Sequence, residues 1–212
     1  MLTVETKFQS GGKLLPHSDL RGGLFLGEAL RRIRRDIKLG TWKYRSLYRA
    51  GSLKAAAREL ARYKLDVVDV QEVRWDKEGT IRAGDYNFFY GKGNENQLGT
   101  GFFVHRRLVS AVKRIEFISD RLSYIVLKGR WLHIIVVNVH ATSEEKNEEL
   151  KDSFYEELEE VFDHFPKHYM KILLGDFNAK LGREDIFKPI IGQESLHQDS
   201  NENGVRLVNF AT

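Results

Sequence analysis

Three apolar segments of the chain each lead into side chains that can hold a cation or contact a phosphate. The polar residues are Glu72 after residues 65–70, His140 at the end of residues 132–139, and Asp176 and Asn178 after residues 170–174. Ligands of open α/β sheets collect at the carboxyl ends of strands, so these side chains are expected to converge. Carboxylates, an amide and an imidazole together can bind a hard cation through oxygen and orient a water against a phosphate.

The spacing within two of these segments favours the same convergence. Asp176 and Asn178 lie two residues apart, so both side chains leave the same face if the extended conformation persists. The same arithmetic places Asn138 and His140 on a common face of their strand. A carboxylate and an amide would then meet in one crevice, with an imidazole and a second carboxylate beside them.

Each of these residues also has a purely structural interpretation. Asp176 could be a turn or capping residue, His140 a hydrogen-bonded structural histidine, and Glu72 the ion-pair partner of Arg74. The functional interpretation is favoured because suitable side chains follow three separate strands. Separate structural roles for the individual residues would not explain why they come together.

The chain around these residues alternates between strand and helix patterns. Residues 37–42 predict a strand, Ser52 is placed as the N-cap of an amphipathic helix containing Leu60, and residues 65–70 predict a buried strand. This order favours a parallel crossover. Asp69 interrupts the apolar strand, where an unpaired buried carboxylate would titrate upward.

The remainder of the chain completes an α/β pattern. The predicted antiparallel strands are residues 86–90, 101–109, 112–118 and 122–128. Residues 132–139 and 170–174 predict strands, residues 144–165 a long helix with an acidic solvated face, and residues 205–210 a short segment of weak signal. The predicted fold class is an α/β two-sheet sandwich with sheets inside and helices outside.

Composition places the chain among globular proteins. Its 212 residues, of which 42% are hydrophobic and 30% charged, suffice for one domain with a layered core. Without cysteine, no disulfide, thiolate metal site or cysteine nucleophile can form. No apolar run reaches the roughly 18 to 20 residues of a membrane span, so we expect no membrane partner. The apolar stretch at residues 22–26 is too short for a signal peptide and basic residues follow it, so we expect an intracellular location.

The basic excess lies near the N-terminus. Residues 1–40 carry eight basic and four acidic residues, with a cluster at Arg31, Arg32, Arg34, Arg35 and Lys38. The cluster could neutralise phosphates, bind a membrane surface, direct nuclear import or form the solvated face of a short helix. We predict a poorly ordered basic leader over residues 1–36 and the domain over residues 37–212.

Several ordered segments between residues 37 and 210 resemble the endonuclease/exonuclease/phosphatase superfamily. They are Gly40-Thr41-Trp42, Arg45-Ser46-Leu47, Val70-Gln71-Glu72-Val73-Arg74, Gly99-Thr100-Gly101-Phe102, Asn138-Val139-His140-Ala141 and Leu174-Gly175-Asp176-Phe177-Asn178. The residues of these motifs are most similar to those in the endonuclease domain of non-long-terminal-repeat retrotransposons of the RTE/BovB-like type. Asn203-Gly204 resembles the short segment that follows the family's catalytic loop.

The resemblance implies Mg²⁺-dependent hydrolysis of DNA phosphodiesters, with Mn²⁺ as an alternative metal, and favours the nucleus. By this likeness Glu72 is the metal ligand and Asp176 orients or deprotonates the attacking water. Asn178 positions the carboxylate and the phosphate, and His140 donates to the scissile phosphate.

Two departures from the family pattern predict impaired activity. Lys43 stands where the family places a metal-binding asparagine, and an ammonium has no lone pair for Mg²⁺. Its charge could oppose a cation, its ammonium could occupy the metal's place and contact phosphate, or its side chain could rotate into solvent.

The second departure is that relatives continue through strands carrying a metal-site aspartate and an aspartate–histidine pair, whereas this sequence stops at Thr212. We therefore expect an incomplete domain that lacks the C-terminal strands and leaves a sheet edge unpaired. The alternative to an impaired endonuclease is a catalytically dead nucleic-acid-binding or interaction module. A phosphatase of the same superfamily ranks below both.

Overall fold

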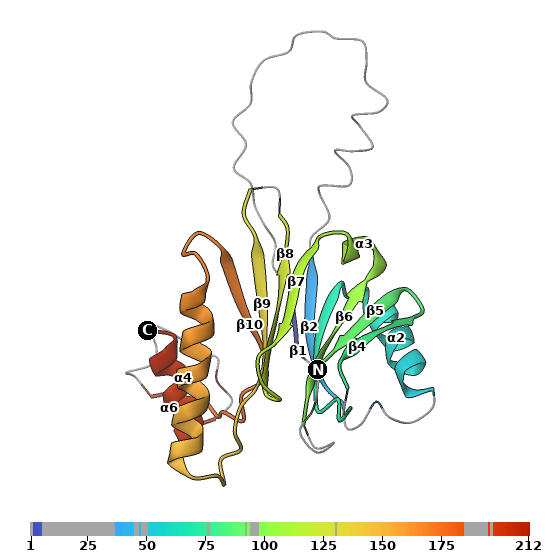
Figure 1. Ribbon diagram of the computed structural model, residues 1–212. Helices are drawn as coiled ribbons and strands as arrows, with labels where there is room; N and C mark the ends of the chain where they lie inside the picture. The colour runs from blue at the N-terminus through green and yellow to red at the C-terminus, as the bar shows by residue number, and fades with distance from the viewer. Residues whose placement is uncertain are drawn as a thin grey trace, which may run out of the picture.

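Two mixed β-sheets form the centre of the molecule (Figure 1). The computed structural model describes residues 2–5, 37–44, 47, 51–75, 77–91, 93, 98–129, 131–184, 195 and 197–212. In spatial order, the first sheet contains β1 (Leu2–Glu5), β2 (Lys38–Lys43), β3 (Val67–Gln71), β6 (Thr100–His105), β5 (Tyr86–Tyr90) and β4 (Gly79–Ala83). The second contains β10 (Met170–Asp176), β9 (Ile134–His140), β8 (Leu122–Leu127) and β7 (Val112–Phe117).

Each sheet has one parallel pair at the position where the sequence predicts the site. β2 pairs with β3 and β10 with β9 in parallel, while the remaining described pairs are antiparallel. The predicted α/β sandwich and the crossover before β3 are therefore confirmed. β1 lies inside the segment predicted to be a basic leader, and Arg31, Arg32, Arg34 and Arg35 lie outside the described residues.

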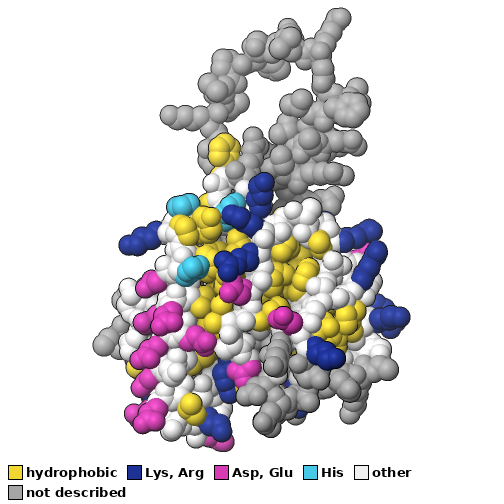
Figure 2. Space-filling view, in the orientation of Figure 1, with side chains coloured by type: hydrophobic (Ala, Val, Ile, Leu, Met, Phe, Trp, Pro, Cys, Tyr) yellow, Lys and Arg dark blue, Asp and Glu magenta, His cyan; other side chains and the backbone are white. Residues whose placement is uncertain are grey.

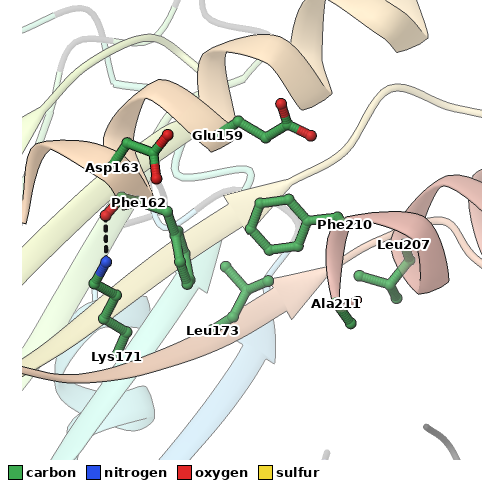
Figure 3. A pocket seen from close by; sticks show the side chains of 8 residues that line it. All are labelled: Glu159, Phe162, Asp163, Lys171, Leu173, Leu207, Phe210 and Ala211. Atoms are coloured by element: carbon green, nitrogen blue, oxygen red, sulfur yellow. Dashed lines mark hydrogen bonds between the residues drawn. The ribbon is translucent and has the colours of Figure 1, made fainter. Parts of the chain in front are cut away.

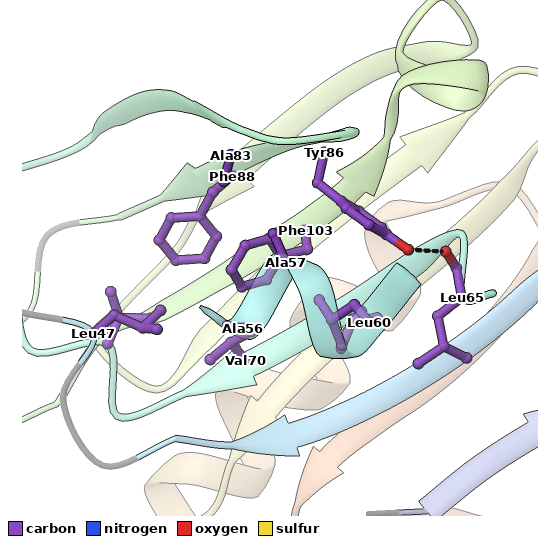
Figure 4. Packing of buried hydrophobic residues seen from close by; sticks show 12 residues of the cluster. Leu47, Ala56, Ala57, Leu60, Leu65, Val70, Ala83, Tyr86, Phe88 and Phe103 are labelled. Atoms are coloured by element: carbon purple, nitrogen blue, oxygen red, sulfur yellow. Dashed lines mark hydrogen bonds between the residues drawn. The ribbon is translucent and has the colours of Figure 1, made fainter. Parts of the chain in front are cut away.

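Helices cover the outer faces of both sheets. α2 (Ser52–Tyr63) buries Ala56, Ala57 and Leu60 against the six-stranded sheet, where Phe88 and Phe103 complete the layer (Figure 4). The Tyr86 hydroxyl closes this layer by donating to the Leu65 carbonyl at 2.7 Å. α4 (Glu148–His164) and α6 (Glu202–Phe210) cover the four-stranded sheet, and acidic side chains gather over the solvent face of α4 (Figure 2).

The seam between the sheets changes character along the strands. Leu39, Val67 and Val136 pack together between the sheets near the start of β2, β3 and β9. Because side chains alternate faces with a period of two, Lys43, Gln71 and His140 point into the same seam nearer the carboxyl ends. The seam is thus apolar at one end and polar at the other, which places the polar groups where the strands end.

Several local predictions were wrong at their boundaries. Ser52 is the first helical residue of α2, and the N-cap is Gly51 in a left-handed conformation with φ 86°, which glycine adopts without steric cost. Residues 106–109 form a short helix, α3 (Arg106–Val109), because the His105 side chain accepts the Arg107 N–H at 3.3 Å. β4 escaped prediction because most of its residues are exposed, so its sequence lacks an apolar pattern.

The long helix starts later than the acidic run suggests. The Asn147 side chain accepts the Leu150 N–H at 3.2 Å and caps α4, so residues 144–147 stay outside the helix. The weak segment predicted at 205–210 is the C-terminal part of α6. Within the described residues, no helix combines the length and apolar character that crossing a bilayer requires.

Candidate functional site

The four predicted site residues lie together where β3, β9 and β10 end. His140 is directly opposite Asp176 in the β9–β10 register, and Glu72 follows β3 without a gap. Lys43, the last residue of β2, joins them: its Nζ lies 2.7 Å from Asp176 Oδ2 and 3.2 Å from Glu72 Oε1. The Lys43 side chain therefore does not rotate away into solvent, and its ammonium lies between the two carboxylates.

Every oxygen of the two carboxylates contacts a donor of the protein. Glu72 Oε1 contacts Lys43, and Oε2 accepts from Arg74 Nη2 at 2.8 Å. Asp176 Oδ2 contacts Lys43, and Oδ1 accepts the Asn178 backbone N–H at 3.1 Å. Two positive side chains therefore compensate the two negative ones.

The contacts between Lys43 and the two carboxylates shift the pKa of Lys43, Glu72 and Asp176 toward their charged forms. Burial alone would lower the pKa of Lys43, but hydrogen bonds and charge from Asp176 and Glu72 raise it above its ordinary value. Burial opposes ionisation of Glu72 and Asp176, yet contact with Lys43 holds both pKa values below the ordinary range. Lys43 thus stays an ammonium in this arrangement.

The His140 imidazole is neutral and almost fully buried. His140 is 5% exposed, and among the described residues its Nδ1 has no hydrogen-bond partner. Burial, followed by the charges of Lys43 and Arg121, lowers its pKa. Arg121 also donates to the His140 carbonyl at 3.1 Å, which holds the strand end in place.

Asn178 reaches the site by a different backbone path from the predicted one. The extended conformation does not persist, because Asn178 has φ 46° in the left-handed region. Its N–H turns back to Asp176 Oδ1, and its Nδ2 donates to the Ala141 carbonyl at 2.8 Å. The predicted common face is therefore wrong, although the two side chains still belong to one site.

Glu72 is also presented by an unusual backbone. Its φ is 59°, and a non-glycine residue in this region costs roughly 1–3 kcal/mol unless its surroundings hold it there. Donation from the Val73 N–H to the Gly99 carbonyl at 3.1 Å anchors the segment. Gly99 itself has φ 101°, so the Gly99-Thr100-Gly101 motif supports the carboxylate.

A buried hydrogen-bond network lies directly behind the site. Gln71 Nε2 donates to Asp69 Oδ2 at 2.7 Å and to Asn138 Oδ1 at 2.8 Å, which joins the two sheets. Thr41 Oγ1 also donates to Asp69 Oδ2 at 3.0 Å. Asp69 is 0% exposed, and burial raises its pKa to about 7, as the sequence predicts in direction.

These residues do not fit a divalent metal as arranged. A hard cation needs free oxygen ligands, whereas all four carboxylate oxygens already bind donors and an ammonium lies between them. Across the part of the chain that the structure describes, no three histidine, aspartate or glutamate side chains are grouped to hold a metal.

Two features of the site escaped prediction. Sequence spacing gives no sign that Arg121 supports the His140 strand end, because the two residues are brought together by β8–β9 pairing. The sequence shows that Lys43 departs from the family pattern, but only the structure shows that its ammonium points toward the carboxylates and not into solvent. The shallow pocket between α4, α6 and β10 contains none of the predicted site residues (Figure 3).

The fold and the site together define a nuclease- or phosphatase-type α/β sandwich. A sequence profile of the Endonuclease/Exonuclease/phosphatase family matches residues 33–207, so the chain belongs to this family, and the predicted resemblance is confirmed. Craniofacial development protein 2 of Bos taurus is 28% identical over 182 residues, which cover 85% of this chain and 30% of that protein. The chain spans just under a third of the length of the curated relatives it matches.

Solved structures share the fold. An AP endonuclease from Leishmania major, LMAP, has a TM-score of 0.56 at 16% identity and covers 80% of this chain and 64% of its own. The endonuclease domain of TRAS1, a telomere-specific non-LTR retrotransposon, has a TM-score of 0.51 at 15% identity and covers 80% and 68%.

Proposed function

We propose that this chain is a nucleic-acid-binding domain built on a phosphodiester-hydrolase site, in which the Lys43 ammonium stands in the metal's place and cleavage is impaired. One observation carries the proposal: Lys43 Nζ lies 2.7 Å from Asp176 and 3.2 Å from Glu72. A retrotransposon-type endonuclease is the proposed ancestor. DNA is the proposed ligand and the nucleus the proposed location.

Charge supports this proposal over a metal-bound site. Lys43 and Arg74 neutralise the two carboxylates, so little negative potential remains to attract a divalent cation. An entering cation would also have to displace an ammonium with two ion pairs.

Donors are available for a phosphodiester oxygen. The Lys43 side chain is 42% exposed, so its ammonium can contact an incoming anion while it remains beside the carboxylates. The second N–H of the Asn178 amide and the imidazole N–H of neutral His140 complete the proposed phosphate contacts. In this proposal Asp176 orients water only inefficiently, because Lys43 holds one oxygen and Asn178 the other.

The relatives support nucleic acid as the ligand class. Two of the solved neighbours are an AP endonuclease and a retrotransposon endonuclease domain, both named as endonucleases. Their likeness to this chain is one of fold, so the ligand assignment depends on the phosphate donors of the site.

Binding of duplex DNA is expected to be insensitive to EDTA and to weaken with added salt, because an ammonium replaces the metal and its contact with a phosphate releases counterions. Fluorescence anisotropy of a labelled duplex measures both effects. Lys43→Ala should weaken binding, whereas Lys54→Ala, an exposed lysine on α2, should not. Binding that requires Mg²⁺ would contradict the proposal.

A Mg²⁺-dependent endonuclease is the second candidate, favoured by the convergence of Glu72, His140, Asp176 and Asn178 at the strand ends. Nicking of supercoiled plasmid by the wild type and by Asp176→Asn, each with Mg²⁺ and with EDTA, separates the candidates. Our proposal expects no difference above background. Efficient nicking by the wild type alone, only with Mg²⁺, would establish the second candidate.

A further inference from the structure

The N-terminal end of α6 is hydrogen-bonded to the loop that carries Asn178. The Asn178 carbonyl accepts from Asn201 Nδ2 at 3.1 Å and from Asn203 Nδ2 at 3.4 Å. Both donors lie more than twenty positions along the chain, so the contacts are tertiary. Two side-chain amides converging on one carbonyl fix the orientation of that peptide unit.

Asn203 is built into the protein interior. Its side chain is 0% exposed, and Nδ2 also donates to the Thr142 carbonyl at 2.8 Å. Its Oδ1 has no hydrogen-bond partner among the described residues. A buried acceptor without a partner lowers stability, so packing alone would favour an apolar side chain at this position. The donor end of Asn203 therefore explains why an asparagine occupies this position.

The neighbouring residues tie the helix to the loop from the other side. Asn201 Oδ1 accepts from the Lys180 N–H at 2.8 Å and from the Gly204 N–H at 2.9 Å. A Cβ on Gly204 would lie 2.0 Å from the Lys180 carbonyl oxygen, so only glycine permits this approach. The Asn203-Gly204 pair thus has a geometric role at the loop.

Further contacts anchor α6 at both of its ends. Its N-terminus is held by Glu144, which accepts from Asn201 Nδ2 at 3.0 Å, and by an ion pair at 2.5 Å between the buried Lys151 and the half-exposed Glu202. At its other end, Phe210 meets Phe162 of α4 with ring centroids 5.0 Å apart (Figure 3). The helix therefore offers the loop a support fixed at both ends.

This support acts on the residue that most needs it. Asn178 has a left-handed backbone, and its N–H and Nδ2 reach Asp176 and Ala141 only in that conformation. Release of the Asn178 carbonyl would let the peptide unit rotate and would move both groups.

We infer that Asn201 and Asn203 are positioning residues, which hold Asn178 and through it Asp176 in the geometry that receives a phosphodiester. This role rests on the proposed function for its consequence in binding. The hydrogen bonds from Asn201 and Asn203 to Asn178 are present whichever ligand the site binds.

The test compares Asn203→Ala with Val208→Ala, because Val208 is a buried residue of the same helix, 2% exposed, whose apolar side chain has no donor for the Asn178 carbonyl. Both variants lose stability, so duplex DNA binding is measured by anisotropy at a temperature where each is folded. Asn203→Ala is expected to bind about tenfold more weakly, the equivalent of one lost hydrogen bond, and Val208→Ala like the wild type. The side-chain amide resonance of Asn178 in ¹⁵N-labelled protein should shift in Asn203→Ala alone.

Asn201→Ser keeps a capping oxygen for α6 but cannot reach the Asn178 carbonyl, and it serves if Asn203→Ala does not fold. Unchanged affinity and an unchanged Asn178 resonance in the variants would overturn the positioning role. If the wild type binds no DNA, the proposed function fails, and the Asn178 resonance alone decides whether the two asparagines position it.

Discussion

Replacement of Lys43 by asparagine is expected to make the thermal stability of this chain respond to divalent cations. The change removes the ammonium between Glu72 and Asp176 and leaves their Oε1 and Oδ2 atoms free for a metal. A cation that binds only the folded state stabilises it by about 2.7 kcal/mol at one hundred times its Kd. Thermal unfolding of both proteins in Mg²⁺, Mn²⁺ and EDTA measures the effect, and the wild type should show none.

The same substitution should lower stability in EDTA, because two partly buried carboxylates then lie near each other without their shared cation. The double variant Lys43→Asn with Glu72→Gln replaces one carboxylate by a neutral amide and should weaken the cation response strongly. A wild type stabilised by Mn²⁺ as strongly as Lys43→Asn would show that Lys43 does not exclude metal. The proposed function would then lose its principal support.

Much of the fold follows from patterns visible in the sequence. The buried strands β3 and β9, the half-buried strand β10 and the amphipathic helices α2 and α4 have strong hydrophobic patterns, so their existence and type are predicted. Glu72, His140, Asp176 and Asn178 were also predicted to converge, because strand ends determine where polar groups meet. Their roles remain proposals.

The rest depends on tertiary contacts that spacing cannot express. Asn178 enters the left-handed region because α6, distant in sequence, holds its carbonyl. Lys43 turns inward because β2 ends beside β10, an adjacency between the two sheets that periodicity does not reveal. Sequence identified the unusual lysine, and only the three-dimensional arrangement assigns its partners.

The balance of charge at the site explains why one residue has so large an effect. Burial alone would raise the pKa values of Glu72 and Asp176, but the neighbouring donors, foremost Lys43, hold both values low. Removal of that cation leaves one net negative charge among these side chains while the remaining site residues stay in place. A single substitution at the end of β2 therefore exchanges an anion-binding site for a cation-binding one in this proposal.

Asp69→Asn is expected to stabilise the chain at pH 8 and to change little near pH 4. Burial raises the folded pKa of Asp69 from 3.8 to about 7, so between these values the native state binds one proton more than the unfolded state. Stability of the wild type therefore falls as pH rises from about 4 to 7, by about 4 kcal/mol for a shift of this size, and is flat above. Asparagine keeps an acceptor for Thr41 and Gln71 and carries no charge to desolvate.

Urea unfolding of wild type and Asp69→Asn at several pH values measures this difference directly. Asp163→Asn, an exposed position on α4, is the matched control and should leave the pH dependence unchanged. Because Thr41 and Gln71 still contact residue 69 in the variant, any gain at pH 8 comes from charge removal. A wild type and Asp69→Asn with parallel stability curves from pH 4 to pH 8 would mean that Asp69 stays ionised at a low pKa, held by contacts stronger than its burial.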